Sequence, residues 1–254
     1  MNSWRRLIRI SLLSSGFGFS LVAVYAQGGP PMITDDPGTP GDGHWEVNTA
    51  FTTEHREGEH SHESPLLDLN YGLGERLQLK YEIAWVHLRD DTGTHAGFGN
   101  SLVGVKWRFF DAGEKAWQAS VYPQVEFNNP GSRADERGLA DHGTSLLLPF
   151  QVRKDFGSFA FNADLGCTWH RTGGTEWFGG VALGREVLHG TEVAVELHAE
   201  AGGRFQRAAV AANVGLRHDL SERCTLLLSL GRELHNARDA RASLLVYLGL
   251  QTRL

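Results

Sequence analysis

Charged side chains recur at every second position along several long segments of the chain. Between Leu77 and Ile83, Lys80 and Glu82 alternate with apolar residues, and similar alternation follows Trp117 and Val193. Successive side chains of a β-strand point to opposite faces, so these acids and bases would share one face of a sheet. A face with both signs of charge can line an aqueous path or close on itself through ion pairs. The candidate pore-lining residues are Lys80, Glu82, Lys106, Arg108, Tyr122, Gln124, Glu126, Arg153, Asp164, Glu196 and Arg217.

Two adjacent aspartates, Asp35 and Asp36, lie in a proline-rich stretch from residue 27 to residue 42. Prolines cannot donate ladder hydrogen bonds and they restrict the backbone, so this stretch is not expected to be a strand. One interpretation is a stiff periplasmic cap, and simple disorder is another. A third is a plug or gate, in which the two carboxylates meet bases on the polar face, such as Arg108, Arg153, Arg217 or Arg253.

Histidines and serines raise two other kinds of chemistry. The run from Glu57 to Glu63 could bind zinc or copper through imidazole and carboxylate groups, but its spacing matches no tight metal motif. The neighbours His60 and Ser61, and His142 and Ser145, suggest a membrane-embedded hydrolase. A nucleophile, however, needs a positioned base and a third orienting group. We therefore predict a solvated charged loop, no metal, no cofactor and no catalytic residue.

The alternating segments number twelve, and most have 9 to 12 residues. That is the length a tilted strand needs to cross a bilayer, whereas the usual strand has about 5 or 6 residues. The segments start near residues 43, 65, 77, 98, 116, 144, 158, 177, 191, 207, 223 and 243. Short connections alternate with longer ones such as 55–64, 89–97, 128–143 and 232–242, as in barrels with tight periplasmic turns. The pattern predicts an all-β, antiparallel transmembrane barrel with both ends periplasmic.

The alternative is a soluble lipocalin-like barrel or a β-sandwich, which buries its apolar face and solvates the other. Here the presumed outer face is rich in aromatic residues, and many of them fall near strand ends, as an interfacial girdle requires. A soluble fold would have difficulty covering so much aromatic surface, so we favour the membrane barrel. These aromatic residues are Trp45, Phe51, Trp107, Trp117, Phe127, Phe159, Phe161, Trp169 and Trp177.

The first 26 residues are predicted to be a cleaved signal peptide. Three arginines precede a mostly apolar stretch, which ends in the sequence Val24-Tyr25-Ala26. Cleavage there would take the net charge from −6 to −9, since the segment holds those three arginines and no acid. So acidic a chain argues against nucleic acid as a partner. The expected order is a signal peptide at 1–26, a periplasmic segment at 27–42 and a barrel at 43–254.

The last nine residues, Val246 to Leu254, form an amphipathic strand that stops on an apolar residue. This ending resembles the signal through which outer-membrane barrels engage their assembly machinery, although Leu254 replaces the commoner phenylalanine. Cys167 and Cys224 both fall on the outward-facing set but on separate strands, so they are expected to stay unpaired. Partners are therefore expected to be outer-membrane lipid, the barrel assembly machinery and a small solute.

The opening of the mature chain resembles that of a bacterial family, the transporter-like outer-membrane proteins associated with the meta-pathway of phenol degradation. The residues that carry the resemblance run from Gly29 through Pro37 and then from Gly43 to Glu46, and the turns at 71–77 and 218–223 also look similar. The resemblance covers most of the mature chain. It implies an outer-membrane β-barrel that passes small compounds, aromatic or hydrophobic ones included. It assigns no catalytic residue.

These observations together predict a passive channel of the cell outer membrane. Two alternatives stay open at this stage: a structural or adhesive barrel without transport, and an outer-membrane lipid hydrolase. The sequence leaves undetermined which solute passes, whether the path is open at rest, and how many copies assemble.

Overall fold

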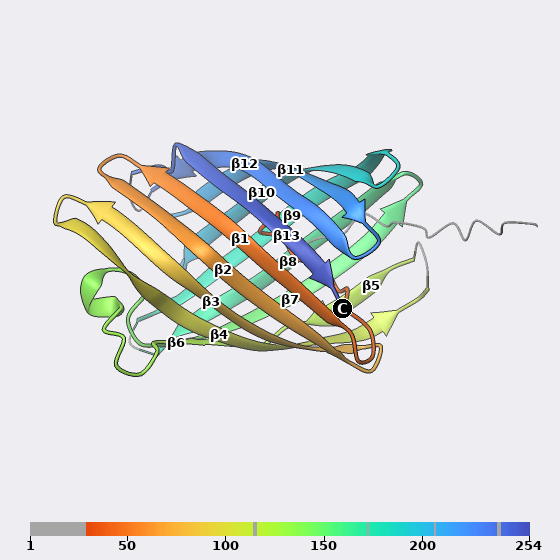
Figure 1. The fold of residues 1–254 in the computed structure, drawn as a ribbon, viewed down its shortest axis with the longest axis horizontal. Helices are drawn as coiled ribbons and strands as arrows, with labels where there is room; N and C mark the ends of the chain where they lie inside the picture. The colour runs from red at the N-terminus through yellow and green to blue at the C-terminus, as the bar shows by residue number, and fades with distance from the viewer. Residues whose placement is uncertain (1–28, 114–115, 172, 206, 238–239) are drawn as a thin grey trace, which may run out of the picture.

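The computed structural model describes residues 29–113, 116–171, 173–205, 207–237 and 240–254. The expected signal peptide and residues 27–28 lie outside this range. Apart from two short strands described below, each strand pairs antiparallel with its neighbours in sequence, and β1 (Trp45–Arg56) also pairs with β13 (Leu244–Arg253). This last pairing aligns Glu46 with Arg253 and His55 with Leu244, and it closes the sheet into a barrel of tilted strands (Figure 1).

The strands between these two follow the predicted order. They are β2 (Glu59–Leu73), β3 (Leu77–Asp90), β4 (Gly93–Asp111), β5 (Gln118–Val121), β6 (Gln124–Phe127), β7 (Thr144–Phe156), β8 (Phe159–His170), β9 (Thr175–Leu188), β10 (Thr191–Gly202), β11 (Ala209–Ser221) and β12 (Cys224–Asn236). Because β5 and β6 both pair with β4 and β7, they are two halves of one barrel strand. Pro123, which has no N–H to donate, marks the break between them. The prediction of a twelve-stranded antiparallel barrel is confirmed.

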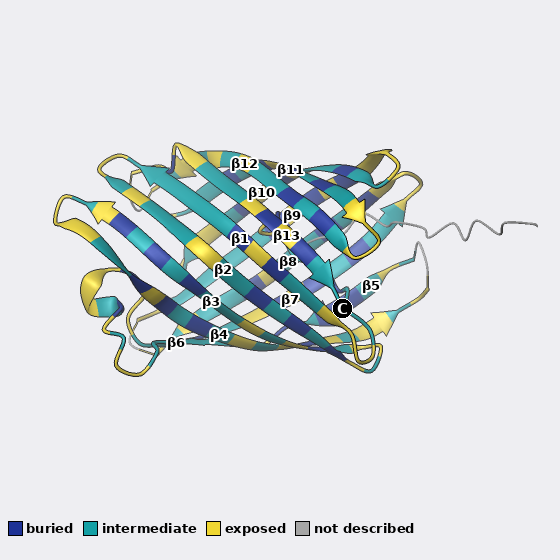
Figure 2. Cartoon of the chain, in the orientation of Figure 1, coloured by how far each residue is buried: buried dark blue, intermediate teal, exposed yellow. Residues whose placement is uncertain are grey.

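Burial alternates along much of the long strands, as the period of two predicts (Figure 2). Polar residues such as Asn48, Gln151 and Gln251 are at most 2% exposed and point into the barrel. Five of the nine predicted outer-face aromatics are at least 40% exposed, and Trp107 and Trp169 reach 52%. A barrel with a polar interior and an aromatic exterior is suited to lipid outside and water inside. Both cysteines are free.

The two ends of the barrel differ in their connections. One end, which we call the turn rim, holds the β2–β3, β4–β5, β7–β8, β9–β10 and β11–β12 connections. The start of β1 and the end of β13 lie there too, since Trp45 and Leu254 exchange two backbone hydrogen bonds of 2.9 Å. The opposite end, which we call the loop rim, holds the β6–β7 connection, the longest in the barrel.

Two of the long loops expected at the loop rim are instead extensions of strands. The β1–β2 and β3–β4 hairpins continue to tight turns at residues 57–58 and 91–92. Gly58 and Gly93 take positive φ angles of 81° and 140° there, a conformation that other residues rarely adopt. The prediction of loops at 55–64 and 89–97 was wrong because polar residues on both faces are compatible with strands that project into water.

The β6–β7 connection, residues 128–143, folds back onto the inner wall of β3. It carries the short 3₁₀-helix η1 (Asp135–Arg137), and its Ala134 and Leu139 are buried against Val86 and Leu88. Asn100 and Asn128 both donate side-chain hydrogen bonds to Asp141 O, at 3.2 and 2.8 Å. Across the described residues, no helix is long and apolar enough to span a membrane.

Replacing Leu139 with alanine is predicted to free this loop from the wall without unfolding the barrel. Truncating a buried leucine typically costs about 2–5 kcal/mol of stability. Even the smaller cost, if it falls on the docking of the loop alone, makes the undocked loop at least about tenfold more populated. Limited proteolysis of the folded barrel should therefore cleave the loop faster in L139A. The exposed Glu136 provides the control, and cleavage of E136A at the rate of L139A would contradict the packing described.

Candidate functional site

The barrel lumen holds the N-terminal residues 29–42, which we call the inner segment. It forms turns rather than a strand: Met32 N donates to Gly29 O, and Gly29 N donates to Thr34 O, each at 2.9 Å. The next backbone amides turn to the barrel wall. Ile33 N and Thr34 N both donate to the carboxylate of Glu196 on β10, the first at 3.2 Å. Thr34 is fully buried as a result.

Both aspartates of the inner segment meet lumen groups. Asp35 forms an ion pair with Lys106 Nζ at 2.9 Å and accepts a hydrogen bond from Gln151 at 2.9 Å. Asp36 pairs with Arg153 at 3.2 Å, and its backbone carbonyl accepts from Lys106 at 2.7 Å. Lys106 therefore binds two successive residues of the segment. Buried charges need such partners, since an unpaired charge away from water is very costly.

The ionisation of Asp35 reflects this arrangement. Burial raises the pKa of its carboxyl group, but the charge and hydrogen bond of Lys106, the Asp36 amide and the charge of Lys80 together leave the pKa below its ordinary value of 3.8. Because the folded pKa is lowered, the contact stabilises the docked segment at neutral pH. This contribution is lost only as the pH falls below that ordinary value.

Three wall glycines make room for the inner segment. A β-carbon on Gly180 of β9 would overlap the hydroxyl of Thr34, and one on Gly215 of β11 would overlap the side chain of Met32. A β-carbon on Gly72 of β2 would overlap the backbone carbonyl of Gly41. The wall is thus shaped to the segment at three separate strands.

The predicted bases do not all contact the aspartates. Arg153 does, whereas Arg217 donates to the backbone carbonyl of Pro30. Arg108 donates to Glu75 O at 2.6 Å near the turn rim. Arg253 donates to Gln251 at 2.9 Å. The lumen bases that pair with the two aspartates are thus Lys106, for Asp35, and Arg153, for Asp36.

The other predicted pore-lining residues contact the wall or the inner segment. Lys80 lies 3.2 Å from Asp68 and 2.7 Å from Glu82, so opposite charges compensate within β2 and β3. Glu126 accepts from Asn100 at 2.8 Å. Asp164 accepts from Asp35 N at 3.3 Å, and Tyr122 accepts from Gln78 at 3.0 Å. Gln124 lines the larger of the two cavities described below.

Sequence reasoning missed several lumen residues that contact these groups. Gln151 lies two positions from Arg153, Gln78 lies two from Lys80, and His198 lies two from Glu196. Each is buried on the inner face. The same period of two would have found them, had every polar residue on the inner face been included.

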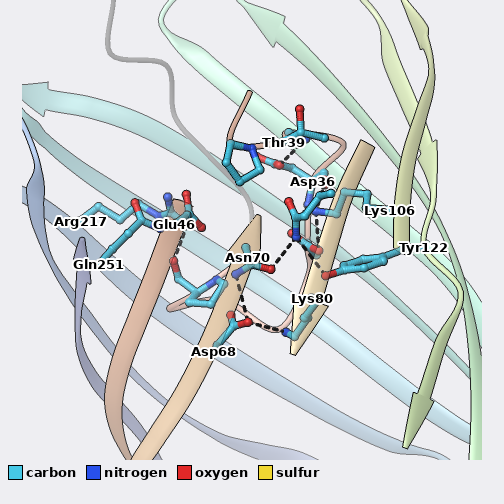
Figure 3. A pocket seen from close by; sticks show the side chains of 16 residues that line it. Asp36, Thr39, Glu46, Asp68, Asn70, Lys80, Lys106, Tyr122, Arg217 and Gln251 are labelled. Carbon is cyan, nitrogen blue, oxygen red and sulfur yellow. Dashed lines mark hydrogen bonds and ion pairs between the residues drawn. The ribbon is translucent and has the colours of Figure 1, made fainter. Parts of the chain in front are cut away.

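The inner segment borders two cavities. A cavity of about 70 Å³ lies among charged and polar groups that include Asp36, Lys80, Lys106 and Arg217 (Figure 3). A second cavity of about 310 Å³ has a mixed lining, with Met32 and Ile33 of the inner segment beside the wall residues Leu147, Pro149, Phe178 and His198. The lumen is therefore partly filled by the inner segment and partly open.

The serine and histidine neighbours of the sequence do not bond each other. His142 bonds Asp135 at 2.6 Å, His60 lies 2.6 Å from His55 between Nδ1 atoms, and Ser145 bonds His170 on the next strand at 2.9 Å. Within the described part of the chain, no group of three or more His, Cys, Asp or Glu side chains is placed to hold a metal ion.

The comparisons with known proteins agree with this architecture. Residues 28–245 match the model of the family described as "Putative MetA-pathway of phenol degradation". The chain belongs to this family. No curated protein matches it. The resemblance noted in the sequence is thus confirmed at the level of the family.

Solved structures share the fold at low sequence identity. An outer membrane channel from Pseudomonas putida F1 matches with a TM-score of 0.70 and 15% identity, over 90% of this chain and all of that one. The NanC porin matches with a TM-score of 0.61 and 10% identity, over 82% of this chain and 100% of that one. The CymD monoaromatic hydrocarbon channel matches with a TM-score of 0.50 and 8% identity, over 84% of this chain and 89% of that one. The fold is that of outer-membrane β-barrels.

Replacing Gly180 with valine is predicted to displace the inner segment, because the new side chain would occupy the space of the Thr34 hydroxyl. The barrel itself should still close, since the valine points into the lumen. Conductance of the refolded G180V barrel in planar bilayers should exceed that of the native chain. G174V, at an open position in a loop, is the matched control. Equal conductance of all three folded barrels would contradict a segment fitted to Gly180.

Proposed function

We propose that this protein is a channel of the cell outer membrane that passes small compounds, aromatic or hydrophobic ones included, by passive diffusion. A cleaved signal peptide directs it through the inner membrane, and the turn rim faces the periplasm. Its partners are outer-membrane lipid, the barrel assembly machinery and the solute itself, and its action is not enzymatic.

The observation that carries this proposal is a lumen that stays partly open on both sides of a docked segment. Small closed barrels fill their interior with side chains, whereas porins with more strands leave an aqueous channel. Here cavities of about 70 and 310 Å³ border the inner segment. The printed titles of two solved structures with this fold, an outer membrane channel and a monoaromatic hydrocarbon channel, are in keeping with the same role.

In this proposal the inner segment is a plug that narrows the path. Its contacts with Lys106, Arg153 and Glu196 hold it in place at neutral pH. A solute follows its gradient past or beside the segment, and no energy input is required. The opposite charges of Lys80 and Glu82 compensate each other, which favours uncharged solutes over ions of either sign.

A structural barrel without transport is the second candidate. It is favoured by the density of hydrogen bonds around Lys106 and Asp68, which resembles a network that stabilises a closed interior. Conductance separates the two candidates, because a barrel that serves only as a scaffold should pass no current.

Planar-bilayer conductance of the refolded mature protein tests the proposal, beside a version that lacks residues 27–42. We expect a small steady conductance that rises on truncation and also rises in D36N, which loses the ion pair with Arg153. D42N is the matched control, because Asp42 binds Gly74 N at the turn rim instead of a lumen base. The absence of current from the native and truncated barrels, both shown to be folded, would overturn the channel function.

A further inference from the structure

The larger cavity contains an apolar patch inside an otherwise polar lumen. Its apolar side chains are Met32 and Ile33 from the inner segment and Leu147, Pro149 and Phe178 from the wall. Ile33 is 48% exposed although it lies within the barrel. Its position is fixed, since its backbone N–H donates to Glu196. The segment thus presents an aliphatic side chain to open space.

Exposed apolar surface has a free-energy cost of about 25 cal/mol per Å² relative to burial, so the cavity would gain from an apolar occupant. Its volume of about 310 Å³ falls within the range of about 300–1,000 Å³ typical of small-molecule sites. Convergent apolar side chains with a few polar groups are the usual composition of such sites.

The wall of the cavity carries two aromatic rings. The rings of Phe178 and His198 are nearly parallel, with an interplanar angle of 20° and 6.3 Å between their centres. Both line the cavity. Aromatic ligands make favourable offset-stacked or edge-to-face contacts with such rings, which an aliphatic ligand cannot do.

The charges around the cavity disfavour an anion. Its lining includes the acids Asp35, Asp164 and Glu200 against one base, Lys80. Lys80 is already paired with Asp68 and Glu82. The neutral groups of Gln124 and Thr168 lie on the same lining and can hydrogen-bond an uncharged hydroxyl.

We infer that this cavity is a binding site for a small uncharged aromatic molecule with a hydrogen-bonding substituent such as a ring hydroxyl. The ring contacts Ile33, Met32 and Phe178, and the substituent meets Gln124 or Thr168. This inference rests on the proposed function, because the channel is the route by which a ligand reaches the site.

Fluorine NMR of the refolded full barrel in detergent micelles tests the site. The probes are para-fluorophenol, fluorobenzene, para-fluorobenzoate and para-fluorobenzylammonium, each corrected for partition into empty micelles. The variants are I33A and F178L, with T39A as the control, because Thr39 lies in the same segment but donates to Glu75 O outside this cavity. The two variants test the site from the segment and from the wall.

The fluorophenol should bind more tightly than the other three probes. I33A removes three side-chain carbons and should weaken binding at least about fourfold, since the loss of one buried methylene costs about 0.8 kcal/mol and tenfold corresponds to about 1.4 kcal/mol. F178L should also weaken it, and T39A should match the native chain. Native-like binding in both I33A and F178L, or tighter binding of the benzoate or the benzylammonium, would overturn the site.

Conductance of the same proteins separates this inference from the channel function. Current without specific binding of the phenol would overturn the site and leave the channel intact. Binding without current would support the site and overturn the channel.

Discussion

The pairing of β1 with β13 is the constraint on which the rest of the structure depends. A sheet in lipid cannot leave its edge N–H and C=O groups unpaired, because no water is present to bond them. Joining the first and last strands removes both edges at once. Once the sheet is closed, every strand has one face toward lipid and one toward an enclosed space. The alternation of side chains along each strand then places apolar residues against lipid and polar residues in the lumen.

Enclosing the polar face costs free energy unless its polar and charged groups are hydrogen-bonded or paired. Lys80 with Asp68 and Glu82 shows one solution, in which neighbouring strands of the wall compensate each other. Lys106, Arg153 and Glu196 show another, because they bind a segment that comes from outside the sheet. The prolines of the inner segment reduce the number of its amides, and the amides of Ile33, Thr34 and Asp35 donate to the wall carboxylates of Glu196 and Asp164. Segment and wall therefore complete each other's hydrogen bonding.

The docked segment also divides the lumen by chemical character. On one side lies the smaller cavity with its charged lining, and on the other lies the larger cavity with the apolar side chains of Met32 and Ile33. Farther toward the loop rim, Leu139 of the β6–β7 connection packs on Val86 and Leu88. The lumen is thus partly apolar toward the loop rim and more polar toward the turn rim. Such a gradient suits a solute that has both an apolar body and a polar group.

The sequence by itself determined the barrel, its strand number and the face on which residues such as Lys80, Arg153 and Trp107 lie. It could do so because the period of two is a local property of the extended backbone, and each strand records it independently. Only the tertiary structure decided that Asp35 meets Lys106, that Gly180 leaves room for Thr34, and that the β6–β7 connection turns inward. Each of these contacts joins a strand to a distant segment that has no periodicity of its own. Their partners depend on which lumen groups remain to be satisfied after the sheet has closed.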